Sequence, residues 1–158
     1  MSAKDVLLAV STSGFAEESA SYAIERAASE PGAKLHVLLV CEPEGEKIAE
    51  KLSESSVGDK VGEQLLQALS RDRRTRGYRW LSGISRDAEA EEVPVETKVV
   101  EGELEPELRR YAEGKSFSEV VVSLPSPGFF SRFFSKQGDP ASRIQRSFSI
   151  PVKVFRYE

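Results

Sequence analysis

The sequence contains few of the residues that build disulfides and metal centres: one cysteine, one histidine and one methionine in 158 residues. The lone Cys41 cannot form a disulfide within the chain, so nothing in the sequence points to an oxidising compartment. His36 lies in an apolar run without a cysteine, a carboxylate or a second histidine at ligand spacing. We therefore expect no metal site and no histidine-based triad, and we expect Cys41 to be a buried structural thiol.

Long hydrophobic runs are also missing. The longest are Val6–Val10 and Val37–Cys41, whereas a helix that spans a bilayer needs about 20 apolar residues. At the amino terminus, Lys4 is followed directly by Asp5 and one short apolar run, which does not match a signal peptide. The sequence predicts a cytoplasmic protein without a membrane span.

An excess of positive charge is absent as well. The chain has 22 basic and 26 acidic side chains, a net charge of −4, which is the wrong sign for a dedicated nucleic-acid binder. Five of the nine residues from Arg71 to Arg79 are nevertheless arginine. This cluster could contact nucleic acid or an acidic partner, but the acidic balance favours a solvated helix face or loop. We expect no nucleic-acid partner.

What the sequence does contain indicates a single globular domain over residues 1–158. Hydrophobic residues make up 39% and charged residues 30% of the chain, which is typical of globular proteins. The length is close to the roughly 150 residues of an average domain.

The first 41 residues predict a strand, a helix and a second strand. Asp5–Ser11 is almost continuously apolar, as in a strand buried on both faces. Ser13 is a candidate N-cap for a helix whose alanines recur at helical spacing until Pro31-Gly32. Lys34–Cys41 predicts a second buried strand, which completes a βαβ unit.

Residues 42–92 are harder to interpret. Apolar residues at helical spacing precede and follow the arginine cluster, with an interruption around Ser53–Gly58. The segment is longer than a parallel crossover requires. We therefore expect the surplus to project from the domain or to cover the sheet.

The rest of the chain alternates strands with helices. Pro106 suits the first position of one helix, Gly114 closes that helix, and Asp139-Pro140 opens the last one. Five strands alternating with helices predict a doubly wound α/β architecture with a parallel sheet. The further strands are predicted at Val93–Val100, Glu119–Leu124 and Val152–Tyr157.

The loop after the fourth predicted strand carries spaced glycines: Gly128, nine residues, Gly138, a polar residue, a helix, and then Ile150-Pro151-Val152. This order resembles the universal stress protein family, whose nucleotide-binding members carry Gly-x2-Gly-x9-Gly-Ser/Thr before a helix and a Pro-Val strand. The resemblance covers nearly the whole chain and includes Gly102–Pro106 and Arg132-Phe133. It implies a Rossmann-like fold with a parallel sheet in the order 3-2-1-4-5 and helices on both faces. It also implies a homodimer through the last strand.

Several positions depart from the family's motif. Its first glycine falls on Pro125, its Ser/Thr falls on Asp139, and its nucleotide-contacting aspartate at the end of the first strand falls on Ser11. Prolines remove the N–H donors that a phosphate cradle needs, and Asp139 would cap its helix from within the protein. We expect no cofactor and weak or no ATP binding. The alternative is an ATP or AMP sensor in which magnesium bridges Asp139 to the phosphates.

If a nucleotide binds, the resemblance and the fold place it beyond the carboxyl ends of the strands, at the switch point of the sheet. The candidate nucleotide-binding residues are Ser11, Val40, Ser123, Gly128, Gly138 and Asp139.

No catalytic constellation emerges from the sequence. Ser11, Thr12 and Ser13 have no identifiable general base, so capping is the safer interpretation. The resemblance then implies a non-catalytic stress-response module that regulates through an unknown protein partner. The last strand is apolar, and a two-fold axis would let it cover itself. The residues expected in this dimer interface are Val152, Val154 and Phe155.

Overall fold

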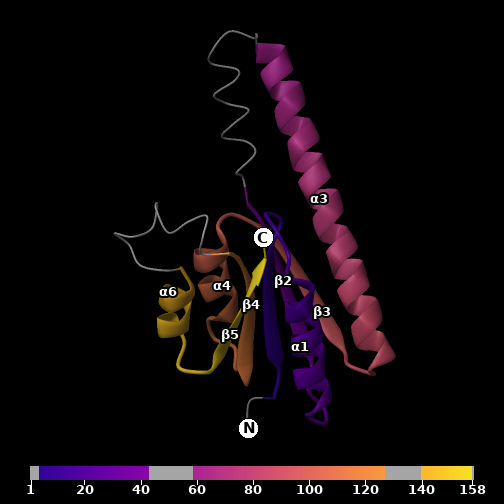
Figure 1. The fold of residues 1–158 in the computed structure, drawn as a ribbon, viewed down its shortest axis with the longest axis vertical. Helices are drawn as coiled ribbons and strands as arrows, with labels where there is room; N and C mark the ends of the chain where they lie inside the picture. Colours follow the sequence, from indigo (N-terminus) through magenta and orange to yellow (C-terminus); the bar gives the residue numbers. More distant parts are fainter. Residues whose placement is uncertain (1–3, 43–58, 127–139, 158) are drawn as a thin grey trace.

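The computed structural model of the protein describes residues 4–42, 59–126 and 140–157. In these residues five strands form one sheet in the order β3-β2-β1-β4-β5, and every neighbouring pair is parallel (Figure 1). This confirms the predicted fold class and strand order, and the predicted strand ends are wrong by two residues at most. The strands are β1 (Val6–Ser11), β2 (Leu35–Cys41), β3 (Val95–Glu101), β4 (Glu119–Pro125) and β5 (Val152–Tyr157).

Helices cover both faces of the sheet, as predicted (Figure 1). One hydrophobic core lies between the sheet and helices α1 and α3, and the other lies between the sheet and α4 and α6. Successive residues of β1 enter opposite cores, as Leu8 and Leu7 illustrate. The helices are α1 (Glu17–Ala28), α3 (Asp59–Ala90), α4 (Leu104–Ala112) and α6 (Pro140–Ser147).

Helix α1 starts later than the sequence indicates. It begins at Glu17, with Ala16 in the N-cap position and no side-chain cap, so the prediction that Ser13 caps this helix is wrong. Ser13 instead belongs to a tight turn in which the Gly14 N–H donates to the Ser11 carbonyl oxygen at 3.2 Å. The later start leaves residues 12–16 as a loop over the carboxyl end of the sheet.

Helix α4 starts earlier than expected. It begins at Leu104, so Pro106 is its third residue rather than its first. Proline is tolerated there because N–H groups in the first turn have no acceptor within the helix. Gly114 follows the helix with a φ of 76°, a conformation that glycine adopts easily, as its predicted closing role requires.

Helix α3 is continuous over 32 residues, a length of about 48 Å. The arginine cluster, which separates two predicted helical patterns, is itself helical. The second half of α3 packs on the sheet through Leu81, Ile84 and Ala88, and the first half extends beyond the carboxyl ends of the strands (Figure 1). Helix α3 therefore both covers the sheet and projects from it. The interruption predicted at Ser53–Gly58 lies outside the described residues.

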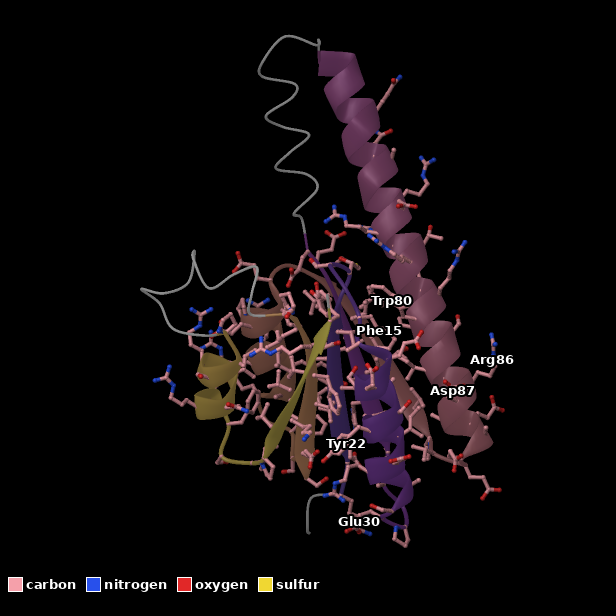
Figure 2. The ribbon with its side chains drawn as sticks, viewed as in Figure 1. Phe15, Tyr22, Glu30, Trp80, Arg86 and Asp87 are labelled. Atoms are coloured by element: carbon pink, nitrogen blue, oxygen red, sulfur yellow. The ribbon has the colours of Figure 1, made fainter. Side chains whose placement is uncertain are left out.

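Gly77 marks the point where α3 leaves the sheet. A Cβ added there would lie 2.7 Å from Leu39 Cδ2 and 3.3 Å from Thr12 Cγ2. About one turn further on, Trp80 points toward Phe15, and their ring centroids are 5.3 Å apart (Figure 2). These contacts fix α3 over the ends of β1 and β2. Among the described residues, no helix combines the length and hydrophobicity needed to cross a membrane.

Candidate functional site

The carboxyl ends of β1 and β4 form the switch point of the sheet, where open α/β sheets bind ligands. After β1 the chain crosses to the α1 face, and after β4 it leads to α6 on the other face. Three of the predicted nucleotide-binding residues lie at or near this edge. Ser11 pairs in register with Val40, and Ser123 lies near the end of β4. All three residues are buried.

Ser11 and Thr12 tie the loop after β1 to its neighbours. The Ser11 hydroxyl oxygen accepts a hydrogen bond from the Ser13 N–H at 3.1 Å. The Thr12 N–H donates to the Val40 carbonyl oxygen at 2.9 Å, which continues the β1–β2 ladder by one residue. These side chains therefore stabilise a turn and the adjoining strand ends, and none of them caps helix α1 as the sequence predicts.

Ser123 supports the start of α1 from the neighbouring strand. Its hydroxyl oxygen accepts a hydrogen bond of 2.7 Å from the Ala16 N–H, and both groups are buried. N–H groups at the start of a helix have no partner within the helix, so Ser123 supplies an acceptor that the loop lacks. This hydroxyl is engaged inside the protein.

Glu42, which no sequence motif marks, joins three elements at the same edge. Its carboxylate accepts hydrogen bonds from the Ser13 hydroxyl and from the Leu104 N–H, both at 3.0 Å. Its own N–H donates to Thr12 Oγ1 at 3.1 Å. Leu104 is the first residue of α4, so Glu42 occupies an anion position at the N-terminus of that helix.

The end of β5 packs against the loop after β1 and against the end of β4. A Cβ on Gly14 would overlap the ring of Tyr157, so only glycine fits beneath that ring. The Tyr157 carbonyl oxygen accepts from the Ser126 N–H at 2.8 Å, and Arg156 Nη1 donates to the Pro125 carbonyl oxygen at 3.0 Å. Pro125, at the first glycine position of the family motif, is thus held by β5.

Two arginines of α3 reach the end of β2. Arg74 forms an ion pair with Glu101, and both Arg74 and Arg73 lie close enough to Cys41 to affect its thiol. Burial raises the pKa of Cys41, and the two guanidinium groups oppose that rise only in part. Cys41 is half-buried rather than buried as expected. A protonated thiol of this kind is not an activated nucleophile.

Three candidate nucleotide-binding residues, Gly128, Gly138 and Asp139, lie outside the described residues. Pro140, directly after them, is the first residue of α6, which is the helix start that the Asp139-Pro140 pair predicts.

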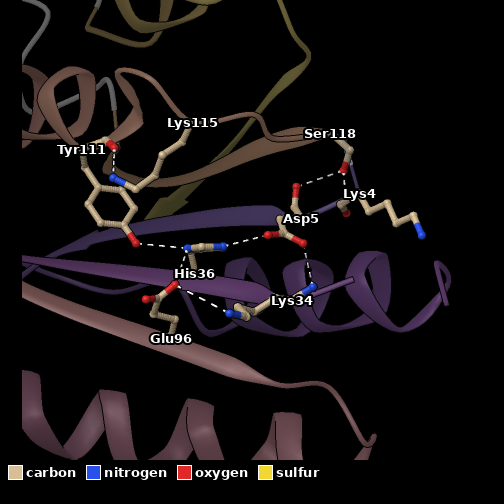
Figure 3. A network of polar contacts seen from close by, with 8 residues as sticks. All are labelled: Lys4, Asp5, Lys34, His36, Glu96, Tyr111, Lys115 and Ser118. Carbon is tan, nitrogen blue, oxygen red and sulfur yellow. Dashed lines mark hydrogen bonds and ion pairs between the residues drawn. The ribbon is translucent and has the colours of Figure 1, made fainter. Parts of the chain in front are cut away.

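A second polar cluster lies near the amino ends of the strands (Figure 3). His36 Nε2 lies 2.9 Å from Asp5 Oδ2, and His36 Nδ1 lies 3.1 Å from the Tyr111 hydroxyl and 3.2 Å from Glu96 Oε2. Two carboxylates that are distant in the sequence approach His36 in the fold: Asp5 directly precedes β1, and Glu96 lies on β3. The carboxylates approach opposite ring nitrogens and do not converge on one point. Among the described residues no cluster of metal ligands is found.

The expected interface residues lie on both faces of β5, an edge strand. Val152 and Val154 pack into the core beneath α4 and α6, whereas Phe155 packs toward Tyr22 of α1 with ring centroids 5.5 Å apart. Within the described residues no strand pairs with the outer side of β5.

The direction of the backbone groups of β5 follows from its bonds to β4. The carbonyl oxygens of Pro151 and Tyr157 accept hydrogen bonds from the β4 side. Backbone groups alternate between the two sides of a strand. The N–H and C=O groups of Val152 and Val154 therefore face the open edge.

Solved structures with this arrangement include universal stress proteins. UspA from Lactobacillus plantarum is 15% identical over 99% of each chain, with a TM-score of 0.67. A member from Burkholderia pseudomallei is 19% identical over 96% of this chain and 95% of that one, with a TM-score of 0.61. A universal stress protein in complex with cAMP is 17% identical over 99% of this chain and 98% of that one, with a TM-score of 0.55. A search of curated protein sequences finds no significant match.

The sequence itself assigns the family. The sequence model of the universal stress protein family matches residues 2–156, nearly the full length. The strand order and the relatedness in fold to these solved structures agree with that match. The chain therefore belongs to the universal stress protein family.

Proposed function

We propose that this protein is a non-catalytic stress-response module of the cytoplasm that regulates other proteins by contact, as a homodimer, and binds ATP weakly or not at all. The observation that carries the proposal is the internal pairing of polar groups at the carboxyl edge. Ser11, Ser123 and Glu42 each accept a hydrogen bond from a backbone N–H of a neighbouring loop or helix. A nucleotide that used these groups would break bonds that hold the edge together.

Glu42 adds an electrostatic cost to nucleotide binding. Its carboxylate lies at the N-terminus of α4, a type of position at which helices hold phosphate. A phosphate about 5 Å from this carboxylate would be repelled by about 3 kcal/mol per unit charge at an effective dielectric constant of about 20. The repulsion favours a module that works without a tightly bound nucleotide.

The proposed homodimer forms through β5. This edge strand carries Val152, Val154 and Phe155, and two of these three direct backbone groups outward. Exposed apolar edge strands tend to pair with other chains. A two-fold axis lets the unpaired backbone groups of both copies bond to each other at once.

Two measurements test the proposal together. Native mass spectrometry of the purified protein should give the mass of the unmodified dimer without a nucleotide. Calorimetric titration with ATP and magnesium should give a Kd no tighter than about 100 µM. A co-purified nucleotide, or a Kd in the low micromolar range, would contradict the proposal.

A nucleotide sensor is the second candidate, and one observation favours it specifically. A similar universal stress protein is in complex with cAMP, and this chain keeps Gly128 and Gly138 of the family motif. In that case ATP, AMP or cAMP would bind at the same edge after Glu42 moves. Titration with all three nucleotides separates the candidates, because a sensor should prefer one of them clearly.

A further inference from the structure

The outward side of α3 carries arginines that the proposed function leaves unused. Residues 71–86 contain six arginines and one acidic residue, Asp72. Arg74 pairs with Glu101, and Arg73 is partly buried. The other four are exposed, and within the described part of the chain no ion pair holds them. They are called the arginine face below: Arg71, Arg76, Arg79 and Arg86.

The four side chains share one side of the helix. Successive residues are about 100° apart around a helix axis, which spreads the arginine face over an arc of about 140°. This arc lies opposite Leu81, Ile84 and Ala88, which pack on the sheet. Figure 2 shows Arg86 pointing away from the sheet. From Arg71 to Arg86 the helix rises about 22 Å.

The arginine face is only partly neutralised by its own helix, because Asp72 lies four positions from Arg76 and Glu89 lies three positions from Arg86. Side chains three and four positions away are the neighbours of a residue on a helix surface. For Arg79 these are Thr75, Arg76, Ser82 and Gly83, none of which carries a negative charge. Positive charge around Arg79, at the middle of this face, is therefore left for an external partner.

An exposed aromatic side chain lies beside these arginines. Tyr78 is 52% exposed, and it is the one large hydrophobic side chain that is exposed among the described residues. Tyrosine and arginine are the residue types most enriched, with tryptophan, at the energetic centres of protein interfaces. The combination indicates a protein-binding surface more than a face that is only solvated.

The surrounding charge selects the kind of partner. Residues 71–86 carry a net +5 in a chain of net charge −4, so the rest of the chain is strongly acidic. Glu89, Glu91 and Glu92 are exposed just beyond Arg86 and bound the positive surface at one end. A long nucleic acid or a lipid surface would extend over these acidic groups, whereas a short acidic segment matches the arginine face alone.

We infer that the arginine face binds an acidic helical segment of a protein partner, with Tyr78 packed against an apolar side chain of that segment. The inference deepens the proposed function, because it names a surface for the protein partner which that function requires. Carboxylates at helical spacing on the partner can each form a charge-assisted pair with a guanidinium group.

The test uses the full-length protein and a fluorescent peptide probe. The probe is a helical peptide of about 20 residues, long enough to follow the arginine face, with glutamates along one side and one leucine stripe. Comparison probes are a peptide of the same composition in scrambled order, a single-stranded DNA of similar charge and phosphatidylserine vesicles. We expect the patterned peptide to bind at physiological ionic strength at least about tenfold more tightly than each comparison probe.

Matched variants identify the surface. Replacing Arg71, Arg79 and Arg86 with glutamine should weaken binding about tenfold, because each exposed pair contributes only modestly. Tyr78→Ala should weaken binding by about fivefold. A control variant with Lys98, Arg110 and Arg146 changed to glutamine removes the same charge elsewhere and should stay within about twofold of the parent. Circular dichroism checks that each variant is folded.

Equal binding of the scrambled peptide, the DNA or the vesicles would overturn the inference, as would equal losses in the two triple variants. Failure of the patterned peptide to bind would overturn it as well. None of these outcomes changes the nucleotide titration, so the proposed function stands or fails by its own measurement.

Discussion

At the scale of single residues, Glu42 links several elements at the carboxyl edge. One carboxylate connects the loop after β1 with the first turn of α4, and the same residue's N–H binds Thr12. The negative charge of the carboxylate also interacts favourably with the positive end of the α4 helix dipole. The charge and the hydrogen bonds of this side chain can be separated by substitution.

We predict that Glu42→Gln raises the affinity for ATP with magnesium by about fivefold or more. The amide oxygen can still accept from Leu104, but the charge that repels phosphate is gone. The same change should lower the free energy of unfolding by about 0.5 kcal/mol through the lost helix-dipole interaction. Calorimetry and urea denaturation measure the two effects.

The control for this prediction is Glu103→Gln. Glu103 is exposed, lies next to Leu104 and makes no side-chain capping bond, so the substitution changes net charge equally. Equal ATP affinity in the two variants would show that overall charge, and not the position of Glu42, limits binding.

Asp5 is expected to make the free energy of unfolding depend on pH in the acidic range. Burial alone would raise the pKa of Asp5, but hydrogen bonds from His36 and from the Lys34 N–H leave it below its usual value of 3.8. A carboxyl with a lowered pKa in the folded state stabilises the fold above its unfolded pKa, and this contribution is lost as pH falls through the folded pKa.

We therefore expect Asp5→Asn to lower the free energy of unfolding at pH 7 by about 1 kcal/mol. The difference from the parent should shrink as the pH falls below about 4. Urea denaturation between neutral and acidic pH measures it. Asp87→Asn, at an exposed position on α3, should show neither effect. If the free energies of unfolding of the parent and of Asp5→Asn differed by the same amount at all pH values, the charge of Asp5 would not contribute to stability.

At the scale of elements, the strands could be predicted and the long helix could not. Strands β1 and β2 are nearly continuous apolar runs, a pattern that their burial on both faces requires. In α3 the apolar stripe is interrupted by Gly77, which disfavours a helix interior, and by a run of arginines, which favour helix but add no apolar side chain to the stripe. Their placement depends on contacts with Leu39 and on solvent exposure, which are tertiary effects.

Two glycines of α3 provide a matched test of its docking. Gly77→Leu should lower the free energy of unfolding by about 2 kcal/mol, because a side chain there meets Leu39 and Thr12. Gly83→Leu should be neutral or should stabilise by up to about 1 kcal/mol, since nothing lies within 4 Å of its Cβ position and leucine favours helix. Thermal and urea unfolding measure both. Equal effects would mean that α3 does not pack on β2 at Gly77.

At the scale of the whole molecule, the two sides of β5 differ in role. One side holds the strand in the sheet, and the other is available for pairing with a second copy. Val154→Pro removes an N–H that faces the open edge, whereas Lys153→Pro removes one that faces β4. We predict that the first variant remains folded and becomes monomeric, and that the second loses stability by about 3 kcal/mol. Light scattering and circular dichroism distinguish the outcomes. A dimer that survives Val154→Pro would place the interface elsewhere.

The site was only partly predictable from the sequence. Ser11, Val40 and Ser123 could be placed at one edge because the carboxyl ends of parallel strands meet there. The role of Glu42 could not, because it depends on α4 beginning 62 residues later in the chain. The partners of His36 could not be predicted for the same reason, since Asp5, just before β1, and Glu96, on β3, are distant from it in the sequence.

The contact between Gly14 and Tyr157 has a consequence for biosynthesis. Residue 14 is made early, and β5 is made after every other described element. Domains emerge from the ribosome amino terminus first. A nascent chain from which β5 is still missing therefore lacks the Tyr157 ring that covers Gly14 in the fold. A chaperone or a ligand that binds the chain before β5 has been made can therefore reach the loop around Gly14, which the Tyr157 ring covers in the complete fold.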